Sequence, residues 1–209
     1  MRTPLTPRHT GMADAVEFSL QMGVPDAGQP EAVRLYWQAF RSKLGRVLGP
    51  DALAIDLLGG AVQANHAVVA LNRSGDLVAM AGFRSAEGGF MPLAPRNLTR
   101  VYGRLGGLWR SALLRQLGDD LGDDQFVIEG VVVHPDWRGR GLGSAMIAEL
   151  AAHARASGYD CVRLEVSDDN RRAKALYQRL GFQTVRHQRL RFLSPVFGMS
   201  GSTIMTRFV

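Results

Sequence analysis

The sequence of 209 residues contains a single cysteine, two lysines and no long hydrophobic run. With Cys161 alone there is no internal disulfide framework, which predicts a reducing compartment and a small buried side chain at that position. No segment approaches the roughly 18 consecutive apolar residues of a membrane span, and the N-terminal stretch MRTPLTPRHTGMADA lacks the apolar core of a signal peptide. The sequence therefore predicts a cytoplasmic protein with no membrane partner.

Positive charge is carried almost entirely by arginine, because Lys43 and Lys174 are the only lysines. The formal net charge of +6 and the pI near 10.2 favour anionic partners in general. The arginines are spread along the chain, apart from Arg186, Arg189 and Arg191, and no basic helix is interleaved with exposed aromatic residues. We therefore expect no nucleic-acid partner, and a nucleic-acid-binding protein is kept only as a rival hypothesis that rests on the pI.

The histidines do not form a metal-binding pattern. His66, His153 and His187 have no cysteine or histidine at ligand spacing, so no metal site is predicted. His134 precedes Pro135, and we interpret it as part of a turn.

The chain is expected to form one domain over residues 1–209, since its length and its 46% hydrophobic residues suit one core and no repeat or linker divides it. The patterns predict an edge strand at 15–23, an amphipathic helix that starts near Pro30 and ends at Gly49, and a second helix capped by Asp51. Next come an antiparallel hairpin of strands 66–71 and 77–83, and near the C-terminus two strands at 183–192 and 202–209 around a loop at 193–201.

Residues 86–124 are too long for an ordinary connection and are predicted to form a helical hairpin inserted between strands three and four. Apolar residues recur there at helical intervals, with a break expected at Gly106-Gly107. Arg96, Arg100 and Arg104 stand four apart on the opposite face. They form either a solvated face or a rim that selects an acidic acceptor.

The stretch 126–182 carries the strongest pattern. It begins with the β-branched apolar run Phe126–Val133, typical of a strand buried on both faces, which Pro135 ends. A glycine loop and a helical pattern that closes at Gly158 follow. The first N–H groups of a helix lack intrahelical acceptors, and the helix dipole adds positive charge there, so this loop is expected to bind a pyrophosphate. The residues assigned to this anion site are Arg138, Gly139, Arg140, Gly141, Leu142, Gly143 and Ser144.

Three nucleotide-binding patterns use such a loop, and the spacing separates them. A phosphate-binding NTPase loop needs a lysine after the glycines, which is absent here. A dinucleotide fingerprint needs a third glycine where Ser144 stands, although Glu165 could serve as its ribose-binding acid. The pattern [QR]-x-x-G-x-[GA] is matched by Arg138, Gly141 and Gly143.

That match extends to Val133-His134-Pro135 before the loop and to Asn170, Tyr177 and Gly181-Phe182 after it. The sequence over these roughly 57 residues resembles the GNAT superfamily of acyl-CoA-dependent N-acyltransferases. The resemblance implies an α/β (α+β) fold, in which helices flank a mixed, mostly antiparallel sheet of about seven strands. Strands four and five of that sheet are parallel and splay apart.

The resemblance also implies that acetyl-CoA is the co-substrate. Its pantetheine would lie between the splayed strands and pair with the backbone of Val131, Val132 and Val133, with Asn170 as a further ligand of the pantetheine or of the loop. A backbone N–H freed near Gly130 would stabilise the developing oxyanion.

Two side chains are catalytic candidates. Glu129 is the only ionisable group in its apolar run, and burial would raise its pKa toward that of a base able to deprotonate an ammonium group. Alternatively, Glu129 pairs with an arginine from another strand and holds the sheet. By the resemblance, Tyr177 is the acid that protonates the departing CoA thiolate, and the alternative is that it only packs in the core.

The function predicted from these residues is transfer of an acetyl group from acetyl-CoA to a primary amine, by direct attack in a ternary complex. The rival is a catalytically silent acyl-CoA-binding or sensing domain. The acceptor is expected to be a small-molecule or peptide amine, and no motif in the sequence identifies it. A homodimer, common in that family, is left open.

Overall fold

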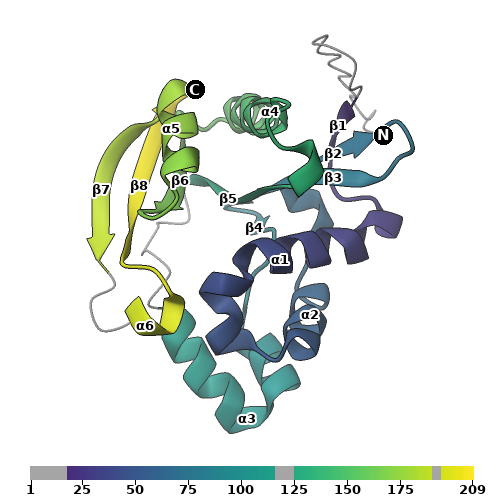
Figure 1. The fold of residues 1–209 in the computed structure, drawn as a ribbon, viewed down its shortest axis with the longest axis vertical. Helices are drawn as coiled ribbons and strands as arrows, with labels where there is room; N and C mark the ends of the chain where they lie inside the picture. The colour runs from purple at the N-terminus through teal and green to yellow at the C-terminus, as the bar shows by residue number, and fades with distance from the viewer. Residues whose placement is uncertain (1–17, 116–124, 190–193) are drawn as a thin grey trace.

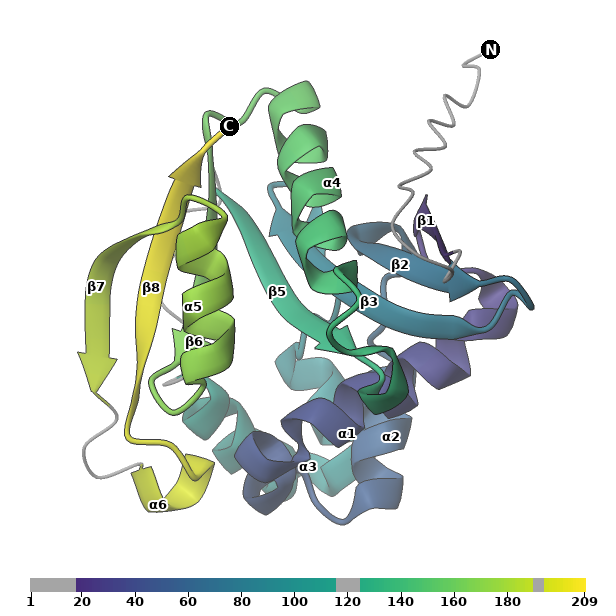
Figure 2. The same ribbon diagram turned by 45° about the horizontal axis from the view of Figure 1, so that its top comes forward.

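The computed structural model describes residues 18–115, 125–189 and 194–209, and a mixed sheet lies at its centre (Figures 1 and 2). The strand order is β1-β2-β3-β5-β6-β8-β7, with the short β4 paired to β3. Only β5 and β6 pair in parallel among the described strands. The mixed, mostly antiparallel sheet and its parallel pair, predicted as strands four and five, are therefore confirmed. The strands are β1 (Phe18–Met22), β2 (Ala67–Asn72), β3 (Leu77–Ser85), β4 (Gly88–Gly89), β5 (Phe126–Val133), β6 (Cys161–Ser167), β7 (Gln183–Arg189) and β8 (Gly201–Phe208).

Helices cover both faces of the sheet (Figure 2). The first face is packed by α4 (Leu142–Ala156) and α5 (Arg171–Arg179), and the second by α1 (Gln29–Leu48). On the outer side of α1 lie α2 (Asp51–Gly59), α3 (Pro95–Leu114) and α6 (Ser194–Phe197). Short 3₁₀ turns at Asp26–Gly28, Ala64–His66 and Pro135–Trp137 connect these elements.

Alternation along β5 explains how one strand serves two cores. Phe126 and Ile128 pack with α4 in the first core, whereas Val132 packs with α1 on the other side. These side chains are at most 5% exposed. Each fully buried side chain of this size contributes about 1.5–3 kcal/mol. The apolar run therefore fixes β5 in the middle of the molecule, and the residues next to it are positioned by both cores.

The predicted insert is helical, but its break lies at Gly103 and not at Gly106-Gly107. Gly103 has φ 72° and ψ 173°, which interrupts α3. Glycine is required at position 107 for lack of space, because a Cβ there would lie 2.5 Å from the backbone nitrogen of Thr99 in the first half of α3. The two halves of α3 thus fold against each other at a glycine contact.

The same break separates the three arginines that were expected on one face. Arg104 follows the interruption, so it does not continue the row of Arg96 and Arg100. The Arg100 guanidinium forms a salt bridge of 3.3 Å with Asp56 of α2. Arg100 therefore ties two helices together, and a single rim of three arginines is not present.

The predictions of a helix cap at Asp51 and of a loop at 193–201 were wrong. Asp51 begins α2 without capping it, since Pro50 is the N-cap residue and the Asp51 carboxylate accepts from Arg41 Nε at 3.0 Å. The loop predicted at 193–201 contains the helix α6. Parts of the predicted strands 15–23 and 183–192 and of the insert lie outside the described residues.

Candidate active site

The glycine loop joins the end of β5 to the start of α4, as predicted. Gly139 and Gly141 adopt φ values of 80° and 81°, a left-handed conformation that L side chains rarely adopt. A Cβ at either position would meet no atom within 4 Å, so the backbone angle, and not space, requires glycine there. The first hydrogen bond of α4 runs from the Ala145 amide to the Gly141 carbonyl, which leaves the earlier amides of the helix free for an anion.

Side chains around the loop hold it in place. Leu142 is 1% exposed and anchors the start of α4 in the first core. Arg138 Nε donates to the Val133 carbonyl at 3.2 Å, and the Arg140 guanidinium lies 4.9 Å from the centre of the Trp137 ring. Both arginines are exposed, and their charges stand at the same end of β5 as the free amides. This end can bind a diphosphate.

The sheet opens between β5 and β6. Their parallel pairing covers three steps, from Phe126 with Val162 to Ile128 with Leu164, and then stops. Beyond it, β5 still pairs with β3 as far as Val133, and β6 still pairs with β8 as far as Ser167. The predicted divergence is confirmed, and β6 is not a pairing partner of Val131, Val132 and Val133.

A β-bulge occupies β5 where the divergence begins. Glu129 pairs with Gly82 and Val132 with Met80, so two residues of β5, Gly130 and Val131, face a single residue of β3. Gly130 has φ 67°, and such a bulge changes the direction of the backbone N–H groups beside it. The irregularity predicted at Gly130 is therefore present at the start of the gap.

Two aromatic side chains of α1 cover this bulge, a contact that no pattern in the sequence indicated. A Cβ at Gly130 would lie 2.7 Å from Tyr36 Cε2 and 3.3 Å from Phe40 Cε2. The two rings are 4.5 Å apart and form a wall over the bulge. The sequence predicted only an amphipathic helix here, because a contact between residues so far apart in sequence depends on the register of the fold.

Glu129 lies beside the bulge and is paired. Arg84 Nε of β3 donates to Glu129 Oε1 at 3.0 Å, and the Glu129 side chain is 33% exposed. Burial raises the pKa of Glu129 above the ordinary carboxyl value, and the charge and hydrogen bond of Arg84 partly offset that rise. Burial also raises the pKa of Tyr36 far above its usual range, with a smaller contribution from the Glu129 charge. The strand-to-strand ion pair considered as the alternative is thus present, and the role of Glu129 as a base stays a prediction.

Tyr177 and Asn170 lie at opposite ends of α5. Tyr177 is 8% exposed and packs 5.9 Å from the Phe182 ring in the first core. Burial raises its pKa to about 12, so its phenol is neutral at physiological pH. Asn170 is the N-cap of α5, with its side-chain oxygen accepting from the Ala173 amide at 3.1 Å. Its predicted role as a ligand therefore competes with a capping bond.

The remaining candidates are structural. The His134 ring accepts from the Asp136 amide at 3.4 Å at the start of the turn Pro135–Trp137, which agrees with its interpretation as a turn residue. Cys161 is half-buried at the first position of β6. Within the ranges that the structure describes, no cluster of three or more His, Cys, Asp or Glu side chains is arranged to hold a metal ion.

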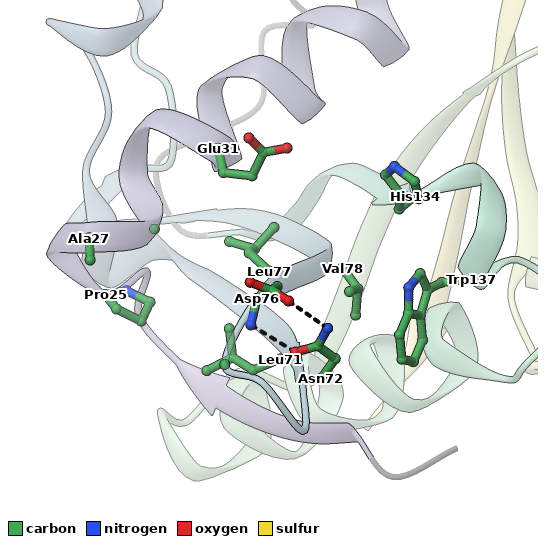
Figure 3. Close-up of a pocket in the computed structure, with 12 residues that line it drawn as sticks. Pro25, Ala27, Glu31, Leu71, Asn72, Asp76, Leu77, Val78, His134 and Trp137 are labelled. Atoms are coloured by element: carbon green, nitrogen blue, oxygen red, sulfur yellow. Dashed lines mark hydrogen bonds between the residues drawn. The ribbon is translucent and has the colours of Figure 1, made fainter. Parts of the chain in front are cut away.

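A cavity of about 600 Å³ lies between the start of α1, the turn that joins β2 to β3, and the segment with His134 and Trp137 that precedes the glycine loop (Figure 3). His134 and Trp137 form one wall, and Glu31 at the start of α1 stands opposite the turn between β2 and β3. In that turn, the Asn72 amide donates to the Asp76 carboxylate at 2.9 Å. The lining includes neither Glu129 nor Tyr177, so this cavity adjoins the anion site without containing the candidate catalytic groups.

Comparison with known proteins supports the same interpretation. Residues 30–182 match the family described as Acetyltransferase (GNAT) family. The chain is 33% identical over 166 residues to mycothiol acetyltransferase of Paenarthrobacter aurescens, an alignment that covers 79% of this chain and 47% of that protein. It is 43% identical over 56 residues to thialysine N-epsilon-acetyltransferase of Bos taurus, which covers 27% of this chain and 33% of that protein. The chain thus spans less than half the length of either curated relative.

The fold is shared with solved acetyltransferase structures. One is an N-acetyltransferase from Staphylococcus aureus Mu50, with a TM-score of 0.61 and 13% identity, covering 90% of this chain and 99% of that one. At this identity the likeness concerns the fold alone. Among the described residues, no helix has both the length and the apolarity needed to cross a membrane.

Proposed function

The chain belongs to the acetyltransferase (GNAT) family, and from that membership we propose that it transfers the acetyl group of acetyl-CoA to a primary amine, by direct attack within a ternary complex. The observation that carries the proposal is the combination of a free helix N-terminus at Gly141 with an open seam between β5 and β6. The helix N-terminus would bind the diphosphate of CoA, and the adjacent seam would accommodate its extended pantetheine chain.

The residues present fit acetyl-CoA. The amides after Gly141 and the charges of Arg138 and Arg140 suit its pyrophosphate. The β5 edge at Val131–Val133, which β6 leaves unpaired, offers backbone donors and acceptors to the amides of pantetheine. Acetyl-CoA supplies an activated carbonyl, and the bulge at Gly130 directs a backbone N–H toward the place where negative charge develops on that carbonyl oxygen.

In this proposal Glu129 accepts a proton from the ammonium group of the acceptor, and the free amine that results attacks the thioester carbonyl. An alkyl ammonium has a pKa of about 10.4, so about one molecule in a thousand is a free amine at neutral pH. Burial brings the pKa of Glu129 closer to that of the ammonium group, while Arg84 keeps the carboxylate ionised and oriented. Tyr36 and Phe40 exclude water from the bulge, which strengthens the electrostatic interactions there.

Tyr177 donates a hydrogen bond to the leaving sulfur. Its pKa of about 12 lies above that of an ordinary thiol, near 8.5, so complete proton transfer from the phenol to the thiolate is uphill. The neutral O–H stabilises the thiolate as it forms, and the proton can arrive afterwards from water. Because a thiolate is a fair leaving group, this contribution is smaller than that of the base.

The test is CoA release measured with a thiol reagent, using acetyl-CoA and a panel of primary amines. We expect amine-dependent release that falls in Glu129→Gln and in Tyr177→Phe, while both variants still bind CoA. The rival, a silent acyl-CoA-binding domain, is motivated by the Arg84–Glu129 ion pair and the Asn170 cap, which give two predicted site residues structural roles. Release that neither substitution changes would refute the assigned roles, and binding of CoA without any release would favour the silent domain.

A further inference from the structure

One buried hydroxyl group joins four elements on the side of the seam that β6 forms. Thr203 of β8 has 0% of its surface exposed. Its Oγ1 lies 2.6 Å from Asp168 Oδ1 directly after β6, 3.1 Å from Lys174 Nζ of α5 and 3.0 Å from His187 Nδ1 of β7. We call these four side chains the Thr203 cluster. It links α5 to β6, β8 and β7, which are neighbours in the sheet (Figure 2).

The protons of the Thr203 cluster follow from the chemistry of its members. A hydroxyl group has one proton to donate and two lone pairs that accept, whereas an ionised carboxylate can only accept. The Thr203 proton therefore goes to Asp168, and the distance of 2.6 Å is typical of a hydroxyl bonded to a carboxylate. Both lone pairs then accept, one from the ammonium group of Lys174 and one from His187 Nδ1. The ring of His187 thus carries a proton on Nδ1, because the hydrogen bond of a ring nitrogen sets the tautomer.

The Thr203 cluster supports the wall of the seam that β5 does not support. β5 and β6 stop pairing after the step that joins Ile128 to Leu164, and from there to its end β6 pairs with β8 alone among the described strands. The helix α5, which follows β6, is tied to β8 through Lys174. Lys174 and Tyr177 are spaced i, i+3, so they lie on one face of α5. The bond from Lys174 to β8 therefore fixes the rotation of α5 and with it the position of Tyr177.

We propose that Thr203 is a positioning residue, whose hydroxyl group holds α5 so that the Tyr177 phenol is directed at the leaving sulfur of acetyl-CoA. The inference rests on the proposed acetyltransferase function and adds a residue that acts through Tyr177. The anion site belongs to the opposite wall of the seam, because its amides lie between β5 and α4. Loss of the Thr203 cluster should therefore slow the chemical step and leave the binding of CoA largely intact.

The kinetic test removes the hydroxyl group and measures chemistry and binding separately. Thr203→Val replaces the hydroxyl with a methyl group, and we expect kcat to fall by about tenfold while the calorimetric Kd for CoA changes by less than about threefold. Thr203→Ser keeps the hydroxyl and should restore kcat to within about threefold of the wild-type value. Thr206→Val is the matched control and should leave kcat unchanged. Thr206 lies on the same strand but on its other face, and its hydroxyl has no hydrogen bond within the described residues.

A double-mutant cycle tests whether the effect passes through Tyr177. In the Tyr177→Phe background, Thr203→Val should lower kcat by less than about twofold, because the hydroxyl group that it misplaces is already absent. An equally large fall in both backgrounds would overturn the coupling, and so would an unchanged kcat in the single variant. Lys174→Met breaks the same link from α5 and replaces Thr203→Val in each comparison if that variant does not fold.

Nitrogen NMR of the histidine rings tests the Thr203 cluster without turnover. At mildly alkaline pH, where an ordinary histidine is neutral, His187 should carry its proton on Nδ1 in the wild-type chain and lose this preference in Thr203→Val. A bare Nδ1 in the wild-type chain would overturn the proton assignment. If no amine is acetylated, the proposed function fails, and the ring signals of Tyr177 decide the positioning role separately. Thr203→Val should shift these signals and Thr206→Val should not, whereas unchanged signals in Thr203→Val would overturn the role.

Discussion

Replacing Gly130 with alanine should be one of the most damaging single-methyl changes in the molecule. Gly130 has φ 67°, and its missing Cβ faces Tyr36 Cε2 at 2.7 Å and Phe40 Cε2 at 3.3 Å. Alanine in a left-handed conformation costs about 1–2 kcal/mol. Overpacking against these two partly buried rings, which pack against the core, costs about 1–3 kcal/mol more. We expect Gly130→Ala to lower the free energy of unfolding by about 2–5 kcal/mol, the sum of these two ranges.

Urea denaturation with a common m-value measures this loss, which corresponds to a fall in Tm of roughly 4–20 °C for a chain of this length. Gly75→Ala is the matched control, because Gly75 has φ 86° and nothing within 4 Å of its Cβ position. It should show the backbone cost alone, about 1–2 kcal/mol. Tyr36→Leu removes the ring edge that the new methyl meets, so in the double variant with Gly130→Ala about 1–3 kcal/mol of the loss should be regained.

Activity provides an independent measurement of the same change. A displacement of about 1 Å at the bulge misdirects the backbone N–H, and we expect kcat to fall by about 10²-fold in protein that is still folded. If Gly130→Ala destabilised the chain no more than Gly75→Ala and Tyr36→Leu restored nothing, the packing of α1 on the bulge would be wrong. If kcat were unchanged, the bulge would not contribute to catalysis.

Three further predictions concern the charged and polar groups around the seam. Arg84→Met removes the charge and the hydrogen bond that lower the pKa of Glu129, so the acidic limb of the kcat/KM profile should move to higher pH, and a limb that moved to lower pH would contradict the pairing. Tyr177→Phe should reduce kcat by about 10²-fold or less without abolishing turnover, measured as CoA release at saturating substrates, and complete loss would contradict a hydrogen-bonding role. Asn170→Ala should cost about 1 kcal/mol of unfolding free energy in urea, because the Ala173 amide loses its cap. The KM for acetyl-CoA should not change, whereas a large rise in that KM would establish Asn170 as a ligand.

The sequence predicted the parts of the fold whose signals are local. The apolar run Phe126–Val133, the glycines after it and the hairpin turn between β2 and β3 each depend on neighbouring residues, and each was placed correctly. The irregularity at Gly130 was expected from the family resemblance, which implies a backbone N–H freed where strands four and five splay apart. Local pattern thus located the glycine loop, and the family resemblance located the start of the open seam.

Contacts between residues that are far apart in the chain could not be predicted from the sequence. In α3, periodicity could not distinguish Gly103, which breaks the helix, from Gly107, which is small because it packs on Thr99. The partner of Glu129 could be expected as an arginine of another strand, but its identity as Arg84 follows only from the register of β3 against β5. The helix α1 was predicted to be amphipathic, but Val33, Trp37, Leu44 and Leu48 pack toward α2, α3 and α6, and which side chains of α1 cover the sheet depends on the completed fold.

The core under α4 and α5 and the cluster that joins α1 to α2, α3 and α6 are separate, and this separation determines which parts of the chain can change independently. No residue of the core beneath α4 and α5 belongs to the cluster that joins α1, α2, α3 and α6, since the sheet stands between them. Changes in the length or sequence of α2, α3 and α6 therefore require no repacking of the layer that supports the glycine loop. Under the proposed function, this layout separates the helices that would select the amine from the residues that would hold acetyl-CoA.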